Sequence, residues 1–509
     1  MGEDFGLFKP ILCSGYYIIW AYIYFHHTCY HNIENIFLQE YNYPKRGVKS
    51  MIQKNLSSYS GLVSRYTELR MQENRSLKIA FVKGNLIRNI KDVGSGISAR
   101  VCKNGSWGFA SSPELDSENI KSVVKAANEN AAFVDSRENK GKSMPEQDGV
   151  SLEKDLSTKK TRLSQKQIMD FIREIDSHIE KKYPGLSNRA VSLECLDMEK
   201  SLITSEGASL YSMLPRSIVR IALTMDKGRG PIEVNDSMGG LGQFEDIFGS
   251  PSDLYGRIDD LYRHLLNKCE GIYAEAGTKT CILDAKLAGI LAHEAIGHTT
   301  EADLVLGGSV AANYMNKEVA SPLITLVDFA HTALGSNCPV PIYIDDEGTL
   351  AKDAVIIDKG ILRSYMHDKE SAALFGAKPT GNARAFQFFD EPLIRMRNTA
   401  ILPGSSKLDD MIASIDDGYY LIQPSNGQAD TTSEFMFGVT LGYEIKNGRL
   451  GRAIKDITIS GVAFDVLKTV TMVSDDMKWI SGGYCGKKQL ITVGMGGPAI
   501  KCKVNIGGR

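Results

Sequence analysis

Two histidines and a glutamate lie close together in the segment His293-Glu294-Ala-Ile-Gly297-His298. Imidazole nitrogens are common ligands of zinc, and a carboxylate beside them is suited to act as a general base on a metal-activated water. A chain of this composition contains such a pattern by chance in about one case in a hundred, so the pattern alone is moderately specific. It predicts a metal site with the elements of hydrolytic chemistry.

The spacing of these histidines requires an irregular helix. Residues 287–292 are apolar and predict a helix that runs into the segment. On a regular α-helix, side chains five positions apart differ by about 140° around the axis, whereas four positions give about 40°. Both rings therefore reach one ion only if the helix widens or unwinds between them. Gly297 lies where this change is needed, and glycine permits it; a helix that simply ends there would also explain the glycine.

A third ligand is needed, because a catalytic zinc site has three protein ligands and one open position. The best candidate is Cys485, which has Gly483 and Gly486 nearby and Lys487 two positions later. The glycines let the backbone approach an ion, and a nearby lysine favours the thiolate. Cys485 is far from the histidines along the chain, so from the residues alone this assignment is a guess.

The composition excludes some classes of function. The chain has 509 residues, 43% of them hydrophobic and 24% charged, with a net charge of −2. Its basic residues are scattered and form no stripe interleaved with aromatic residues, so we expect no nucleic-acid partner. The nine cysteines include no CxxC pair, and their odd number and irregular spacing suit a reducing compartment better than a disulfide-stapled secreted domain.

The first 50 residues differ from the rest. Pro10 to Ile33 contains no charged residue, and Tyr16 to Phe25 is strongly apolar. This apolar stretch is shorter than the roughly 20 residues of a spanning helix, and it lacks the basic start of a signal peptide. We therefore expect residues 1–50 to be an extension without a structural role, with Met51 as a sensible start. A membrane anchor is the alternative, and we consider a membrane partner unlikely.

The remaining chain divides into four predicted regions. Residues 51–134 form an N-terminal α+β domain with a hairpin at Asn104-Gly105, and the charged residues 135–160 form a linker. Residues 161–276 form a middle α+β domain, with a helix from Ser164 and strands over 189–225. Residues 277–509 form a β-rich C-terminal domain that carries the metal segment.

The mixture of strands and helices lacks regular βα alternation, which indicates an α+β fold. We expect an N-terminal α/β sandwich-like region, followed by a β-rich C-terminal domain with largely antiparallel sheets. Asp358-Lys359-Gly360 and Lys446-Asn447-Gly448 mark hairpins in that domain. The glycine-rich runs 239–242 and 494–497 lack the strand-to-helix context of a phosphate site, so they predict turns rather than nucleotide binding.

Several separate motifs resemble the TldD/PmbA family of metallopeptidases. The resemblance extends over residues 65–508 and rests on these segments: His293-Glu-Ala-Ile-Gly-His298-Thr-Thr-Glu301, Cys485-Gly-Lys-Lys-Gln489, Val493-Gly-Met-Gly-Gly-Pro498, Gly105-Ser-Trp-Gly-Phe109, Ile344-Asp-Asp-Glu-Gly-Thr349, Gly381-Asn-Ala-Arg384 and Arg395-Met-Arg-Asn-Thr399.

This resemblance implies the metal-binding subunit of the family. One zinc ion per chain is then held by His293, His298 and Cys485, and Glu294 is the catalytic base. The family implies a cytoplasmic homodimer, or a heterodimer with an inactive relative, that cleaves short or unfolded peptides in extended form. A non-catalytic binding or regulatory subunit with a structural metal is the alternative; it would not require Glu294.

Four further residues are predicted to support the site. Glu301 is expected to orient a ligand, with a solvated carboxylate at a helix end as the alternative. Arg384, Arg395 and Asn398 are expected to line the substrate path, and here the alternative is that they are exposed polar side chains of strands. Asp303 is grouped with Glu301.

Overall fold

The computed structural model describes residues 52–63, 66–138, 148–228 and 230–507. The extension or anchor predicted over residues 1–50 lies outside this part of the chain. Among the described residues, no helix combines the length and the apolar character needed to cross a membrane. The described fold consists of α-helices and largely antiparallel sheets, which confirms the predicted α+β class.

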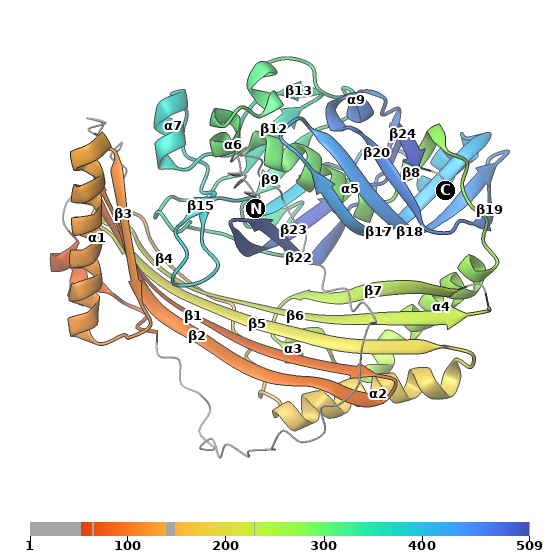
Figure 1. Cartoon of the computed structure of the whole chain (residues 1–509), viewed down its shortest axis with the longest axis horizontal. Helices are drawn as coiled ribbons and strands as arrows, with labels where there is room; N and C mark the ends of the chain where they lie inside the picture. Colours follow the sequence, from red (N-terminus) through yellow and green to blue (C-terminus); the bar gives the residue numbers. More distant parts are fainter. Residues whose placement is uncertain (1–51, 64–65, 139–147, 229, 508–509) are drawn as a thin grey trace, which may run out of the picture.

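A long curved sheet of seven strands forms the N-terminal half, in the order β3-β2-β1-β5-β6-β4 with β7 also paired to β6. Figure 1 shows it as an arc beneath the C-terminal half. The predicted hairpin at Asn104-Gly105 joins two of its strands, and both turn residues have positive φ. Its strands are β1 (Tyr66–Val82), β2 (Asn85–Lys103), β3 (Ser106–Ser112), β4 (Ser151–Asp155), β5 (Asn188–Thr204), β6 (Ser209–Asp226) and β7 (Pro231–Leu241).

Helices cover the sheet where its strands carry apolar side chains. Helix α1 (Ser117–Glu138) packs on the β2–β3 end of the sheet. Helix α2 (Gln165–Lys182) begins with a capping box between Ser164 and Gln167, and its isoleucines pack on β1 and β5 together with α4 (Tyr255–Cys269). The 3.6-residue apolar period of α2 explains this packing. Short helical turns η1 (Ser57–Leu62), η2 (Pro251–Leu254) and α3 (Phe244–Ile247) complete this half.

The segment predicted as a linker contains parts of a helix and a strand. Helix α1 continues to Glu138, and strand β4 pairs in parallel with β6. Strands of the predicted first and middle domains also lie in this one sheet. The charged composition of 135–160 hides β4, because an edge strand is held by backbone hydrogen bonds and needs few apolar side chains. Residues 139–147 lie outside the described part.

The C-terminal half contains a six-stranded sheet in the order β13-β12-β9-β16-β23-β22. The hairpin predicted at Asp358-Lys359-Gly360 joins β12 to β13. All neighbours in this sheet pair antiparallel except β16 and β23. Its strands are β9 (Leu326–Phe329), β12 (Ala354–Asp358), β13 (Ile361–Leu362), β16 (Asn398–Ile401), β22 (Lys478–Lys487) and β23 (Gln489–Gly497).

A second C-terminal sheet closes on itself, because β17 pairs with both β8 and β18 in the order β17-β8-β24-β20-β18. The hairpin predicted at Lys446-Asn447-Gly448 joins β18 to β19. The strands are β8 (Gly277–Leu283), β17 (Asp417–Ala429), β18 (Glu434–Lys446), β19 (Arg449–Ala453), β20 (Ile457–Val462), β21 (Met472–Val473) and β24 (Ile500–Gly507). Shorter elements are β10 (Thr332–Ala333), β11 (Ser336–Asn337), β14 (Ala383–Arg384), β15 (Leu393–Ile394), α6 (Ala302–Leu306), α7 (Lys369–Phe375), α8 (Leu408–Ala413), α9 (Ala463–Lys468) and η5 (Val310–Asn313).

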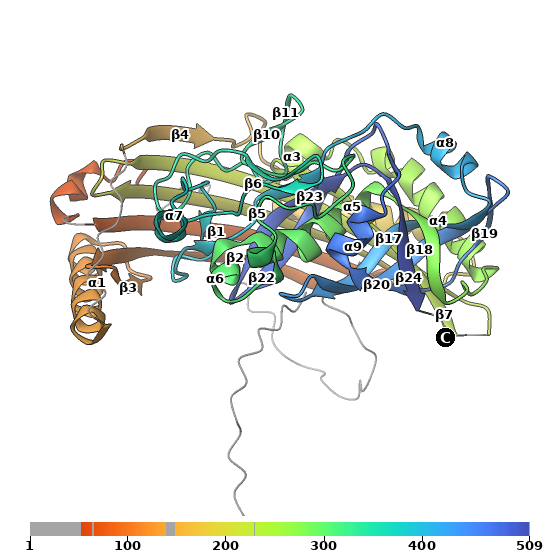
Figure 2. The ribbon, with the colours of Figure 1, turned by 90° about the horizontal axis from the view of Figure 1, so that it is seen from above.

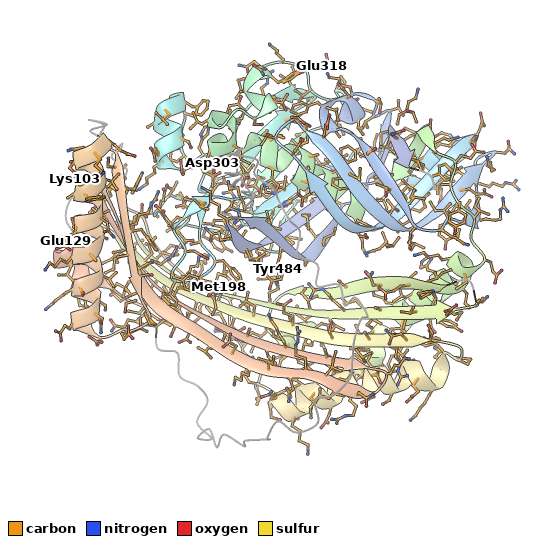
Figure 3. All side chains as sticks on the ribbon, viewed as in Figure 1. Lys103, Glu129, Met198, Asp303, Glu318 and Tyr484 are labelled. Carbon is orange, nitrogen blue, oxygen red and sulfur yellow. The ribbon has the colours of Figure 1, made fainter. Side chains whose placement is uncertain are left out.

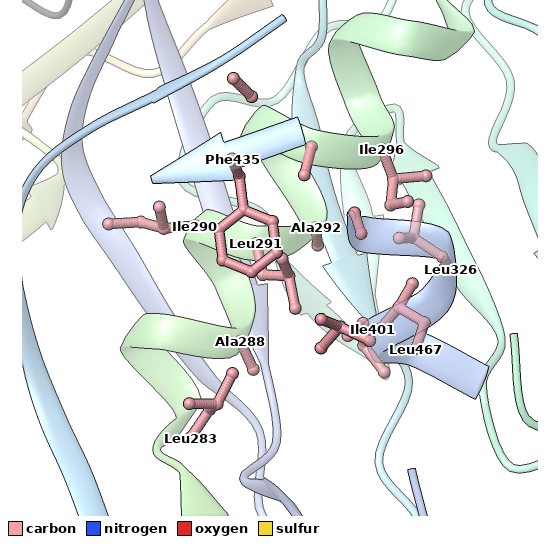
Figure 4. Packing of buried hydrophobic residues seen from close by; sticks show 14 of the residues in the cluster. Leu283, Ala288, Ile290, Leu291, Ala292, Ile296, Leu326, Ile401, Phe435 and Leu467 are labelled. Atoms are coloured by element: carbon pink, nitrogen blue, oxygen red, sulfur yellow. The ribbon is translucent and has the colours of Figure 1, made fainter. Parts of the chain in front are cut away.

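Helix α5 (Ala285–Leu291) lies between these two sheets and leads to the metal segment. Figure 4 shows Leu291 and Ile296 packed among Leu326, Ile401 and Phe435, which come from β9, β16 and β18. The largest apolar cluster of the described residues surrounds this helix. A helix that is apolar on every side except at Lys286 requires such burial.

The glycine-rich runs lie in strands, which corrects the prediction of turns. Residues 239–241 end β7, and residues 494–497 belong to β23. A Cβ atom on Gly289 of α5 would lie 3.0 Å from the backbone nitrogen of Gly496. Helix α5 can therefore approach β23 closely because both partners lack side chains at this point.

The two halves meet through polar side chains on the concave face of the long sheet. Arg70, Gln72 and Asn74 alternate along β1 and donate hydrogen bonds to backbone carbonyls of residues 386–390. Lys200 of β5 binds both carboxylate oxygens of Asp346. The view from above in Figure 2 shows the strands running beneath the C-terminal elements. This contact fixes the C-terminal half on the sheet.

Candidate metal centre

Helix α5 widens at the metal segment, as the histidine spacing predicts. After Leu291 the chain forms a π-helical turn over Ala292–Gly297 and a 3₁₀ turn over His298–Thr300. The rings of His293 and His298 come to 5.3 Å between centroids, with an interplanar angle of 81°. A π-helical turn contains more residues than an α-helical turn, so side chains five positions apart come to lie on one face.

Gly297 is required by packing as well as by the irregular turn. A Cβ atom built there would lie 2.0 Å from Sδ of Met396, which is fully buried. The prediction attributed this glycine to backbone freedom, yet its φ of −56° is an ordinary helical value. The close approach of Met396 therefore explains the glycine better than conformational freedom does.

Cys485 meets the two histidines across the C-terminal half. Its Sγ lies 3.2 Å from Nε2 of His298, and ligand atoms of His293, His298 and Cys485 all lie within 4.8 Å of one another. The antiparallel hairpin of β22 and β23 carries the cysteine on the face that packs against α5. All three residues are at most 1% exposed. The structure thus brings together the ligand set predicted from two distant segments.

Glu301 and Lys487 form a chain of hydrogen bonds that begins at His298 of this cluster. Nδ1 of His298 lies 2.8 Å from Glu301, and Nζ of Lys487 lies 3.3 Å from the same carboxylate. Lys487 also binds Asp303 at 2.8 Å. Glu301 is fully buried, whereas the side chain of Asp303 is 41% exposed; Figure 3 labels Asp303 beside the site. The alternative of a solvated carboxylate therefore fails for Glu301.

The charges of the cluster shift its acid–base properties. Burial raises the pKa of Glu294 to about 7. Burial also opposes ionisation of Cys485, yet the charges of His298 and Arg395 hold its pKa well below the usual range. In the same way, Lys487 and His298 overcome burial and lower the pKa of Glu301 to about 2. The site therefore favours a thiolate at Cys485 and a proton-accepting group at Glu294 near neutral pH.

Lys487 does not act directly on the thiolate as the sequence suggests. It lies two residues after Cys485, but its Nζ is bound to Asp303, Glu301 and the carbonyl of Ile394. Arg395 takes the expected role, since its charge lowers the pKa of Cys485, and it also donates to the backbone carbonyl of that residue at 2.8 Å. Proximity in sequence predicted the wrong cation beside the Cys485 thiolate, because Lys487 contacts segments that are distant in the chain.

The three polar residues predicted beside the substrate path are all buried, so they are not exposed polar side chains of strands. Arg395 is fully buried and binds the carbonyls of Cys485 and Gln489. Asn398 bonds to the backbone of Val340. Arg384 donates to the carbonyls of Met396 and Thr492, and it also lines a cavity. Through these hydrogen bonds, Arg395 and Asn398 hold neighbouring backbone segments in place.

Sequence reasoning missed Arg216 of β6. Its Nη1 donates to the carbonyls of Ser481 and Gly483 at 3.3 and 3.0 Å, and its guanidinium lies 4.4 Å from the ring centre of Tyr484. It thereby supports the strand that carries Cys485. The available signal was an arginine in the alternating apolar pattern of Leu210 and Leu214, which predicts a buried charge.

The donor set fits a zinc ion. Both ring nitrogens of His293 are buried and have no hydrogen-bond partner among the described residues. Glu301 holds Nδ1 of His298, which leaves Nε2 for a metal, as in many metal-bound histidines. Sulfur and nitrogen ligands of tetrahedral zinc lie about 3.5 Å apart, and Sγ of Cys485 is 3.2 Å from Nε2 of His298.

Comparisons with known proteins place this fold and cluster in a family of metallopeptidases. A sequence profile of the PmbA/TldA metallopeptidase C-terminal domain matches residues 276–508, and that of domain 1 matches residues 67–131. A metalloprotease TldD homolog of Buchnera aphidicola subsp. Schizaphis graminum is 32% identical over 87% of this chain and 92% of its own length. The chain belongs to the TldD/PmbA family of metallopeptidases.

Other relatives agree with this assignment. A zinc metalloprotease TldD homolog of Saccharolobus solfataricus is 29% identical over 82% of this chain and 90% of its own. The crystal structure of TldE from Thermococcus kodakarensis has a TM-score of 0.69 at 17% identity, over 89% of this chain and 98% of its own. A protein from Thermotoga maritima, described as a modulator of a DNA gyrase, has a TM-score of 0.71 at 18% identity, over 87% of this chain and 96% of its own. At such identities the two structures show a shared fold.

Proposed function

We propose that this chain is a zinc-dependent peptidase, with one zinc ion on His293, His298 and Cys485 and with Glu294 as the catalytic base. The position of Glu294 carries this proposal. Its carboxylate is buried and lies 3.8 Å from Nε2 of His298, one of the atoms offered to the metal. A structural zinc site is closed by its ligands and needs no such carboxylate.

The chain and the metal have separate roles in this reaction. A bound zinc ion supplies Lewis acidity, which polarises a carbonyl and lowers the pKa of a coordinated water. Glu294, with its pKa raised to about 7, accepts a proton from the attacking water and returns it to the leaving amine. A base with a pKa near the working pH performs both transfers efficiently.

The burial of the site limits the substrate. The ligands and Glu294 are at most 1% exposed, so the compact surface of a folded protein does not reach them. The proposed substrates are short or unfolded peptides, because only an extended segment could be taken up at so buried a site. A second part of the proposal is a cytoplasmic homodimer or a heterodimer with an inactive relative; the fold shared with TldE would let two such chains pair in similar ways.

A Glu294→Gln variant tests the catalytic role. We expect it to retain about one zinc per chain by elemental mass spectrometry and to lose cleavage of short unstructured peptides, followed by mass spectrometry. A Cys485→Ser variant should lose most of the metal, and Asp303→Asn, which changes a half-exposed neighbour, should retain metal and cleavage.

Two outcomes contradict the proposal. If Glu294→Gln cleaves peptides as fast as the parent, Glu294 is not the base. If the folded parent binds zinc and peptide but cleaves none, alone or with an inactive relative, the chain is instead a binding or regulatory subunit with a structural metal.

A further inference from the structure

A cavity lies between the concave face of the long sheet and the C-terminal half, apart from the metal centre. Strands β5 and β6 form one side, and residues 339–346 form the other. Figure 3 labels Met198, which lines the cavity from the sheet. The cavity volume is about 50 Å³, which is room for a few waters or one aliphatic side chain.

The cavity and the metal centre are on opposite faces of the β22–β23 hairpin. Thr492 lines the cavity and is the register partner of Tyr484, which contacts the long sheet through Glu194. Cys485 and Ile491, one position along each strand, point into the core around α5. Side chains alternate between the faces of a strand, so a ligand in this cavity does not touch the metal ligands.

Most of the cavity wall is aliphatic. The sheet contributes alternate side chains of β5 and β6, and residues 339–346 contribute a proline-containing run. The aliphatic side chains are Leu196, Met198, Leu210 and Leu214 from the sheet and Val340 and Ile342 from that run. Such a wall favours the burial of an apolar group of similar size, because removing apolar surface from water is favourable.

Arg216 stands apart among the charged groups that line the cavity. The Lys200 ammonium already binds both oxygens of Asp346 and the carbonyl of Ala385. Arg216 is 5% exposed, uses Nη1 on two carbonyls and lies over the ring of Tyr484, but its Nη2 is buried with no hydrogen-bond acceptor among the described residues. A buried cationic donor without an acceptor is unfavourable, so this atom favours an anionic ligand.

We propose that this cavity takes the aliphatic side chain of a small carboxylate against the leucines of β5 and β6, with the carboxylate bound to Arg216 in the cavity wall. The chemistry is that of a leucine-like residue with a free carboxyl group. It is supplied either by the C-terminus of a peptide or by a free branched-chain acid. The site is independent of zinc and of peptide hydrolysis.

Calorimetric titration of the full chain with three probes tests this site. N-acetyl-L-leucine carries the carboxylate, N-acetyl-L-leucinamide is its neutral match, and 4-methylpentanoate carries no peptide group. We expect N-acetyl-L-leucine to bind about tenfold or more tightly than the amide, because a charge-assisted hydrogen bond is lost. Equal affinity of 4-methylpentanoate indicates a free acid as the source, and weaker affinity indicates a peptide C-terminus.

Matched variants locate the binding. Arg216→Gln should reduce the affinity for N-acetyl-L-leucine to that for the amide. Arg220→Gln is the control, since Arg220 lies on the same face of β6, binds the carbonyl of Gly482 and does not line the cavity. Ser212→Leu places a larger side chain in the wall and keeps Arg216, so it should abolish binding even if Arg216→Gln fails to fold.

Zinc-loaded and chelator-treated protein should bind the acid equally. The proposal is overturned if the acid and the amide bind alike, if chelation abolishes binding, or if Ser212→Leu binds as the parent does. It is also overturned if the parent shows no saturable binding up to about 10 mM, which corresponds to a very weak site.

Discussion

Nδ1 of His298 lies 2.8 Å from a carboxylate oxygen of Glu301 while Nε2 of the same ring lies 3.2 Å from Sγ of Cys485. One ring thus connects a buried carboxylate to the proposed metal position. A carboxylate on the distal nitrogen fixes the ring orientation and makes the other nitrogen a better ligand. Glu301 is itself held by Lys487, so this support extends over two side chains.

Removing the Glu301 carboxylate should therefore weaken zinc binding. We expect Glu301→Ala to lower zinc affinity about 10- to 100-fold, and Glu301→Gln, which keeps an acceptor oxygen, to have a smaller effect. Competition with a chromophoric chelator measures both. Asp303→Asn is the control, because Asp303 shares Lys487 but is not hydrogen-bonded to the ring. Unchanged affinity in Glu301→Ala would show that the ring is held by other contacts.

Arg395 should contribute strongly to the stability of the strand that carries Cys485. Arg395→Met removes the donor from the buried carbonyls of Cys485 and Gln489, and we expect a loss of about 2–4 kcal/mol in the free energy of unfolding. Denaturant unfolding at fixed zinc concentration measures it. Arg452→Met, at a side chain that is 67% exposed, should change stability by less than about 0.5 kcal/mol. Equal losses in the two variants would contradict the role of Arg395.

The sequence predicted the α+β class and the widened helix because both depend on local patterns. Apolar periodicity located α2, two Asn-Gly turns located the β2–β3 and β18–β19 hairpins, and a Lys-Gly turn located the β12–β13 hairpin. The five-residue spacing of His293 and His298 required the helix to widen or unwind, and the structure contains a π turn there. Steric and periodic constraints of this kind act over a few residues, so they are visible in a single sequence.

Contacts between distant segments could not be predicted in the same way. The partners of Lys487 and the close approach of Met396 to Gly297 arise from packing between separate elements. Strand β4 is held by backbone pairing with β6, which leaves little trace in its side chains. The meeting of Cys485 with the histidines came from family resemblance, since spacing along the chain does not determine which strands become neighbours.

The stability of the interface between the two halves should depend on the protonation of Glu68. Burial raises the pKa of Glu68 to about 7, although Arg100 lies 3.5 Å away. Between its ordinary pKa of 4.5 and about 7, the folded state holds a proton that the unfolded state has released. Stability from this group is therefore greatest below the ordinary pKa and is lost as pH rises through the folded value.

Glu68→Gln removes this loss, so its thermal midpoint relative to the parent should become more favourable from pH 5 to pH 8. The corresponding gain in the free energy of unfolding is at most about 3 kcal/mol, because a pKa difference of one unit corresponds to about 1.4 kcal/mol. Thermal unfolding across this range measures it, with Glu129→Gln on the exposed face of α1 as the control. A constant difference between Glu68→Gln and the parent would mean that Glu68 titrates alike in both states.

Gly297 and Met396 should behave as one packing unit. A Cβ atom on Gly297 would lie 2.0 Å from Sδ of Met396, and overpacking of this kind costs about 1–3 kcal/mol. We expect Gly297→Ala to lose that much stability and also some zinc, because the shift displaces the neighbouring His298. Met396→Ala should destabilise by leaving a cavity, while the double variant should be more stable than the sum of the single losses implies.

Gly256→Ala in α4, where nothing lies within 4 Å of the added atom, should be neutral or stabilising. Denaturant unfolding and zinc content of the four variants measure the cycle; strictly additive losses would show that Met396 does not determine the need for glycine.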